Sequence, residues 1–157
     1  MRVFVAVEIE DEIKERIAAL QRALGRVDGV KWVEPQNLHL TLKFLGEIEP
    51  GLASRLANSL AGAAAETPSF RLRLGGTGVF PDAGRPRIVW VGLKEGFEQL
   101  FALAQKVEAA AQELGFAAET RPFKAHLTMG RVRRPAAGKE LLPALEGAEA
   151  ADFGEQK

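Results

Sequence analysis

The chain has 157 residues, of which 46% are hydrophobic and 27% are charged, a balance typical of one soluble globular unit. It contains no cysteine, which excludes disulfides and thiolate nucleophiles and fits a reducing compartment. The apolar run near the start, residues 3–7, is too short for a signal-peptide core, and no later run approaches a membrane span. We therefore expect a cytoplasmic protein with no membrane partner.

Charge is balanced overall but uneven along the chain. Lys and Arg together number 21, and so do Asp and Glu, so the molecule as a whole does not attract a polyanion. Residues 121–139, however, carry six basic residues and no acidic one. This strip is either a solvated face or a surface for a small anion or one nucleic-acid end, and it suits a long duplex less well.

The predicted elements repeat along the chain. The first unit is a strand, a helix that ends at Gly25, a short strand and a long strand, over residues 3–9, 13–24, 30–33 and 38–45. An alanine-rich helix and an alternating strand follow, over about 51–66 and 70–74. Gly75, Gly76 and Gly78 come next and are interpreted as turns, because the Lys-Ser/Thr of a P-loop is missing. Trp32 and Trp90 are assigned to the core.

The second unit has the same order of elements. It consists of a strand, a helical stripe, a short extended piece and a long strand, over residues 87–93, 97–114, 116–120 and 124–132. A helical stretch over about 139–150 follows. The repeat then requires a strand matching residues 70–74, but the chain stops at Lys157, so we expect this strand to be missing and one sheet edge to be exposed.

Both histidines of the chain occur in the same tripeptide, His-Leu-Thr, once in each long strand. Because strand side chains alternate between faces, His39 and Thr41 share one face, and so do His126 and Thr128, about 6–7 Å apart along the strand. A lone histidine on a strand is usually a half-buried structural residue, but the matched pair indicates duplication or constraint. If the two units face each other, two imidazoles and two hydroxyls meet in one cleft.

This set of groups suits phosphoryl chemistry. A neutral imidazole accepts a proton from water, a protonated imidazole donates one to the leaving oxygen, and Thr hydroxyls donate to phosphate oxygens. A zinc site would need three or four ligands, and no carboxylate lies near either histidine in sequence. The sequence therefore predicts acid–base catalysis by His39 and His126 with no metal and no cofactor.

The segments HLTLKFLG (39–46) and HLTMGR (126–131) resemble the paired motifs of the 2H phosphoesterase superfamily. The similarity is closest to its RNA 2′,3′-cyclic phosphodiesterase branch, also called 2′-5′ RNA ligases, and extends over nearly the whole chain. Lys124 and Ala125 stand where this branch often has a proline. From the resemblance we expect the family's final strands to be missing.

The resemblance implies an α+β fold with two RRM-like lobes related by a pseudo-twofold axis, whose antiparallel sheets flank a central cleft. We place the lobes at about 1–50 and 85–135 within a single domain, 1–157, with crossover elements over 51–84 and a truncated C-terminus over 136–157. The resemblance also makes His39 the proton donor and His126 the proton acceptor, although the near-identical motifs do not distinguish these roles by themselves.

Other residues near the motifs are candidates for binding the substrate. Arg131 matches an arginine of the family's second motif and is expected, with Thr41 and Thr128, to bind the phosphate. Lys43 either joins the site, on the polar face of His39 and Thr41, or lies beyond the cleft. The candidate RNA contacts are Phe4, Lys43, Phe80 and Lys124, where the aromatic rings either stack on a terminal base or pack in the core.

The expected activity is hydrolysis of RNA 2′,3′-cyclic phosphate ends to 2′-phosphomonoesters without ATP, together with the reverse 2′-5′ joining of RNA ends. Such ends, including those of tRNA halves, are the expected partners, and we expect a monomer. Two alternatives stay open from sequence. One is a non-catalytic module that binds RNA ends, and the other is a 2H enzyme for a different cyclic phosphate.

Overall fold

The computed structural model describes residues 2–25, 29–81, 84–134 and 152–156. Within these ranges the chain forms two antiparallel β-sheets and three α-helices, which confirms the predicted α+β class. The elements in chain order are β1 (Arg2–Glu8), α1 (Asp11–Leu24), β2 (Val30–Trp32), the 3-10 helix η1 (Pro35–Asn37), β3 (His39–Glu47), α2 (Pro50–Ala65), β4 (Leu72–Phe80), β5 (Ile88–Glu95), α3 (Phe97–Glu113), β6 (Leu127–Val132) and β7 (Asp152–Gln156).

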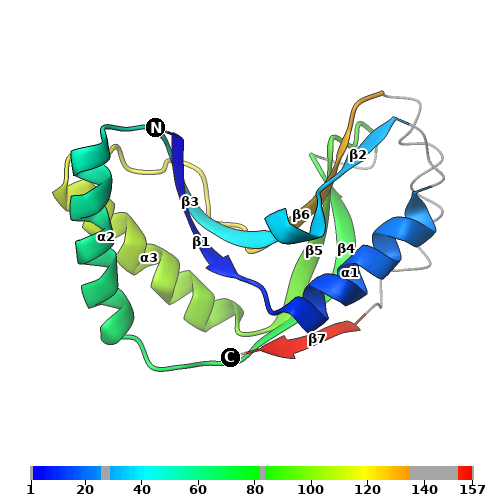
Figure 1. Cartoon of the computed structure of the whole chain (residues 1–157), viewed down its shortest axis with the longest axis horizontal. Coiled ribbons are helices and arrows are strands. Elements are labelled where there is room, and N and C mark those ends of the chain that lie inside the picture. Colours follow the sequence, from blue (N-terminus) through cyan, green and yellow to red (C-terminus); the bar gives the residue numbers. More distant parts are fainter. Residues whose placement is uncertain (1, 26–28, 82–83, 135–151, 157) are drawn as a thin grey trace.

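The two sheets lie on opposite sides of the molecule. The smaller sheet pairs β1 with β3, and α3 contacts β3 and α2 on that side. The larger sheet has the strand order β2-β6-β5-β4-β7, and α1 contacts β7 and η1 on its side. Figure 1 shows this division, with α2, α3, β1 and β3 on the left and α1 with the larger sheet on the right.

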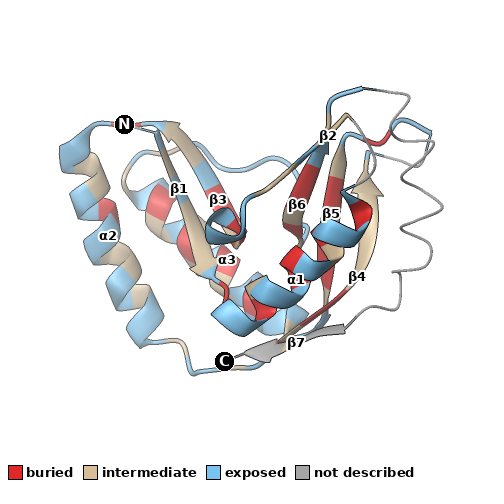
Figure 2. Cartoon of the chain, turned by 45° about the vertical axis from the view of Figure 1, so that its right-hand side comes forward, coloured by how far each residue is buried: buried red, intermediate tan, exposed pale blue. Residues whose placement is uncertain are grey.

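The core forms where the apolar faces of helices and strands meet. In α1 the buried residues Ile13, Ile17 and Leu24 recur at intervals that place them on one helical face. The buried strand residues alternate with outward-facing ones, and the largest fully buried side chains are Ile17, Leu38, Leu40, Leu72, Leu74, Leu100, Leu127, Met129, Val89 and Val91. Figure 2 shows the buried positions of α1, β5 and β6, whereas α2 is mostly exposed.

The sheets are not built from contiguous halves of the chain, which corrects the expected lobes at 1–50 and 85–135. Strand β2 of the first half pairs with β6 of the second, with Val30 opposite Val132. Strand β4, from the expected crossover, pairs with β5 and β7. The helices are exchanged as well, since α1 packs beside the larger sheet and α3 beside β3. Long-range pairing of this kind leaves no local signal in the sequence.

Three expectations about strands are also corrected. The Gly-rich stretch after residue 74 continues as β4, and a Cβ on Gly78 would lie 2.2 Å from Cζ2 of the Trp90 indole, so glycine is needed for the ring to cross the strand. Residues 116–120 form no strand; the carbonyl oxygen of Ala117 and the backbone N–H of Glu119 bond to side chains instead. Residues 152–156, where no strand was expected, form β7, which pairs with β4. The expected helix over 139–150 lies outside the described residues.

Candidate active site

The fold brings the two His-Leu-Thr motifs to the junction of the two sheets. His39 is the first residue of β3, and His126 directly precedes β6. Strands β3 and β6 contact each other although they belong to different sheets. In Figure 1 they begin next to one another in the middle of the molecule and diverge from there. Both histidines are therefore located where the strands start.

Each imidazole is held by the same backbone hydrogen bond. Nδ1 of His39 lies 2.6 Å from the carbonyl oxygen of Asn37, and Nδ1 of His126 lies 2.7 Å from that of Lys124. A carbonyl oxygen can only accept, so Nδ1 carries the proton in both rings. This fixes the orientation of both rings and leaves Nε2 of each as the nitrogen that can exchange a proton with a substrate.

An aromatic ring packs against each histidine. Phe4 of β1 stacks on His39, with ring centroids 4.6 Å apart and an interplanar angle of 19°. Phe80 of β4 meets His126 at an angle of 88°, with centroids 4.9 Å apart. The ammonium of Lys124 lies 5.1 Å from the centroid of the Phe80 ring. The two predicted aromatic candidates and Lys124 are thus next to the histidines.

Both motif strands carry a β-bulge at the same position. Thr41 pairs with Ala6 and Lys43 with Val5, so Leu42 is an extra residue in β3. In β6, Thr128 pairs with Trp90 and Gly130 with Val89, so Met129 is an extra residue. A bulge changes which face the following residues occupy.

The bulge in β3 corrects the expectation for Lys43. In an unbroken strand Lys43 would share the face of His39 and Thr41, but the extra residue turns it to the opposite, buried side. There its ammonium lies 2.5 Å from Oε1 of Glu108 on α3 and 3.2 Å from the carbonyl oxygen of Ala117. The Lys43 side chain is only 4% exposed, so it does not face the motif residues.

Glu108 holds its charge through this arrangement. Burial alone would raise the pKa of the Glu108 carboxyl, but hydrogen bonds from Lys43, Gln112 and the backbone N–H of Glu119 outweigh it. The pKa of Glu108 therefore lies below its ordinary value, and the carboxylate is ionised at neutral pH.

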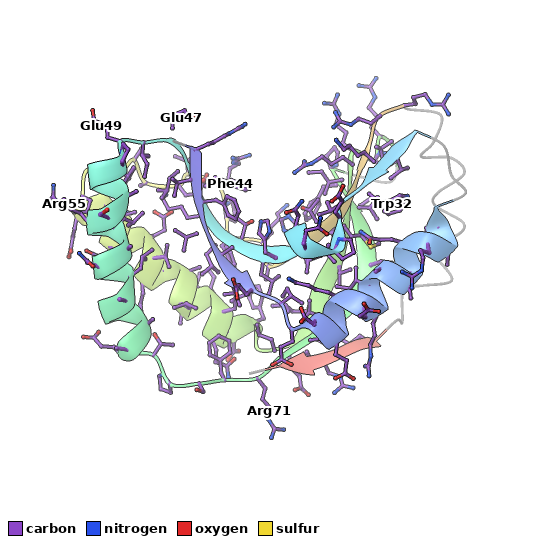
Figure 3. All side chains as sticks on the ribbon, in the orientation of Figure 1. Trp32, Phe44, Glu47, Glu49, Arg55 and Arg71 are labelled. Atoms are coloured by element: carbon purple, nitrogen blue, oxygen red, sulfur yellow. The ribbon has the colours of Figure 1, made fainter. Side chains whose placement is uncertain are left out.

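Because of the same bulges, the fifth residue after each histidine lies on the strand face that carries the histidine and the threonine, here called the motif face. On β6 this residue is Arg131, which pairs with Ile88, two residues before Trp90, and is exposed beside Thr128. On β3 it is Phe44, which pairs with Phe4 and is 69% exposed. Figure 3 shows Phe44 on the side of β1 and β3 that faces the larger sheet. The site is thus symmetric in histidine and threonine but has a cation on one strand and an aromatic ring on the other.

Sequence reasoning missed three residues on this face. Phe44 could have been found by aligning the two motifs, since it occupies the position of Arg131. Lys31 of β2 lies directly opposite Arg131 in the sheet and adds a second exposed cation, but only the long-range pairing reveals it. Trp90, assigned to the core, is opposite Thr128 and packs 5.3 Å from Phe80. Trp32, by contrast, does pack against the core, beneath Gly130.

The family follows from comparison with known proteins. The model of the family described as LigT like Phosphoesterase matches residues 7–90 and 91–156, which is nearly the whole chain. The chain belongs to the LigT-like phosphoesterase family. The family model matches twice, and the second match begins inside β5, close to the start of the second repeat unit.

Individual relatives of the LigT-like chain agree with this assignment. A protein of Archaeoglobus fulgidus named RNA 2′,3′-cyclic phosphodiesterase is 44% identical over 134 residues, which are 85% of this chain and 74% of the relative. Among solved structures, TT0787 of Thermus thermophilus has a TM-score of 0.76 and 33% identity, covering 86% of this chain and 76% of that one. Escherichia coli LigT complexed with 3′-AMP has a TM-score of 0.72 and 31% identity, covering 83% and 72%.

Two further observations concern the whole described part of this LigT-like chain. Among its described residues, no three His, Cys, Asp or Glu side chains gather into a group that would hold a metal ion. None of the described helices combines the length and the apolar character needed to cross a membrane. The groups that the structure places at or beside the motifs are imidazole, hydroxyl, guanidinium, ammonium and aromatic side chains.

Proposed function

We propose that this protein hydrolyses 2′,3′-cyclic phosphates at RNA ends to 2′-phosphomonoesters by paired-histidine acid–base catalysis. One observation carries the proposal: two imidazoles, each with Nδ1 bonded to a carbonyl and Nε2 left for chemistry, lie at the starts of two strands that contact each other. The names of the relatives, RNA 2′,3′-cyclic phosphodiesterase, support this substrate.

In the proposed reaction one histidine acts as the base and the other as the acid at the same phosphorus atom. Nε2 of His126 accepts a proton from water as the water oxygen attacks the phosphorus. The P–O3′ bond breaks, and Nε2–H of His39 donates a proton to the departing O3′. Exchange with solvent then returns both rings to their starting states. The assignment of donor and acceptor follows the family resemblance.

The remaining residues of the site would hold the phosphate. The hydroxyls of Thr41 and Thr128 donate to the non-bridging oxygens, and the guanidinium of Arg131 adds a charged donor on the β6 side. The ring strain of the cyclic phosphate drives the bond cleavage, and the histidine pair transfers the protons. The reaction therefore needs no ATP and no metal ion. A 5′-hydroxyl of a second RNA in place of water would give a 2′-5′ linkage by the same step, for example between tRNA halves.

The first experiment measures hydrolysis of 2′,3′-cyclic nucleotides by the wild type, His39→Ala and His126→Ala, with and without EDTA. We expect each variant to lose about 10²–10⁴-fold in kcat with its fold intact, and wild-type activity to persist in EDTA. If the wild type binds cyclic-phosphate RNA ends but releases no phosphomonoester, the protein is a binding module. Hydrolysis confined to other cyclic phosphates would instead reject RNA as the substrate.

A second experiment separates the two histidines. The leaving group of bis(p-nitrophenyl) phosphate departs without a proton, so it makes a general acid unnecessary. We expect His39→Ala to lose far less activity on this substrate than on a cyclic nucleotide, whereas His126→Ala loses activity on both. The opposite pattern would reverse the proposed roles.

A further inference from the structure

A buried glutamine of α1 joins the two halves of the site. Gln21 is only 6% exposed, and its Nε2 donates to the carbonyl oxygens of Val33, at 2.8 Å, and Met129, at 2.9 Å. Val33 follows β2 on the segment that leads to His39, and Met129 is the bulge residue of β6. The backbone N–H of Val33 also donates to the Met129 oxygen, at 2.9 Å. Gln21 thus links the segment that leads into the first motif with the strand that carries the second motif.

An ion pair between β3 and α3 makes the reciprocal connection. Glu108 accepts from the ammonium of Lys43, the residue after the bulge of β3, and from the backbone N–H of Glu119 at 3.4 Å. Lys43 also donates to the carbonyl oxygen of Ala117. Residues 117 and 119 belong to the strandless segment between α3 and β6 that leads to His126. The Lys43–Glu108 pair therefore links the segment that leads into the second motif with the strand that carries the first motif.

The internal repeat relates the two connections. Position 108 follows position 21 by 87 residues, the same interval that separates His126 from His39 and Met129 from Leu42. In both helices the polar side chain contacts the segment entering the motif of its own half and the bulged strand of the other half. One connection uses a neutral amide and the other an ion pair, so the geometry is shared although the chemistry differs.

We infer that Gln21 and the Lys43–Glu108 pair are positioning residues that set the placement of the two motifs relative to each other. The inference rests on the proposed function, since it concerns how two imidazoles reach one phosphate. Directed hydrogen bonds from a rigid helix fix the distance and direction of the carbonyl, amide or ammonium they bind, whereas apolar packing leaves these free to shift. A displacement of about 1 Å remote from the chemistry can cost roughly 100-fold in rate.

The test compares variants that remove a connection without leaving a charge buried. Gln21→Met removes the first, and the double variant Lys43→Met/Glu108→Leu removes the second together with both charges. Leu56→Ala, at a buried position of α2 outside both connections, is the control for loss of stability alone. Each protein is assayed for kcat and KM on a 2′,3′-cyclic nucleotide and for its thermal midpoint. Inorganic phosphate is titrated while the ring-proton NMR signals of both histidines are followed.

We expect both connection variants to lose about 10- to 100-fold in kcat at temperatures where they are fully folded. Phosphate should shift both histidine signals of the wild type with one dissociation constant, and should bind more weakly to the variants. The Leu56→Ala control should lose stability but keep its kcat. Wild-type kcat and phosphate affinity in the variants, or an equal loss of kcat in the control, would overturn the inference. A wild type that binds phosphate but hydrolyses nothing would refute the proposed function alone.

Discussion

The ion pair between Lys43 and Glu108 allows a quantitative prediction about stability, because its two partners are buried to different extents. The Lys43 side chain is 4% exposed and that of Glu108 is 24% exposed. Glu108→Leu leaves a buried ammonium whose remaining partner is the Ala117 carbonyl, and we expect a loss of about 3–5 kcal/mol. Lys43→Met leaves a partly exposed carboxylate that keeps its other hydrogen bonds, and we expect a loss of about 1–3 kcal/mol.

The double variant carries no buried charge, so it should be more stable than Glu108→Leu. Its loss of unfolding free energy should be well below the sum of the losses in the two single variants. Thermal and urea unfolding give the stability of the wild type, the two single variants and the double variant. For a chain of this length about 1 kcal/mol corresponds to roughly 2–4 °C, so Glu108→Leu should unfold about 6–20 °C below the wild type. Additive losses in the double variant, or a larger loss for Lys43→Met than for Glu108→Leu, would refute the argument from burial.

Three further predictions follow from the site and its surroundings. Phe44→Ala should raise KM for 2′,3′-cyclic nucleotides about tenfold, because a base can no longer stack on the ring. KM for a methyl riboside 2′,3′-cyclic phosphate, which has no base, should not change. An equal rise in KM for both substrates would reject stacking. Gly78→Ala should displace the Trp90 indole and cost about 1–3 kcal/mol, seen as a shift in tryptophan fluorescence, whereas Gly62→Ala, with no atom within 4 Å of its added Cβ, should show neither effect. Because folding lowers the pKa of Glu108, its contribution to stability is complete above the ordinary value of 4.5 and is lost as the pH falls through the lower folded value. Acid unfolding should therefore be less steep in Glu108→Leu, and an unchanged slope would contradict the shift.

Local patterns predicted most elements and the centre of the site. The apolar spacing from Ile13 to Leu24 predicted α1 nearly to the residue, and the His-Leu-Thr repeat identified two strands of equivalent design. Strand alternation placed each threonine on the face of its histidine, and that holds because the bulge comes only after the threonine. Where the chain keeps a regular period, sequence spacing is sufficient to assign faces.

The same alternation failed one residue beyond the bulge. Lys43 was assigned to the motif face, and the extra residue in β3 turned it to the core, where it pairs with Glu108 of a distant helix. No residue type in β3 marks the bulge, which shows only in the pairing of β3 with β1. The Gly-rich part of β4 was mistaken for turns for a similar reason, since the Trp90 ring on the neighbouring strand leaves no room for a side chain at Gly78.

By itself the sequence determined the order of strands and helices, the repeat and the pair of histidines, because these depend on residues that are neighbours in the chain or recur at a regular spacing. Only the tertiary structure decided which half supplies which strand, which face Lys43 occupies, and that Lys31 joins the site. The physical reason is that these outcomes depend on contacts between segments many residues apart. A one-residue change in register there reverses a side chain's direction without altering any local preference.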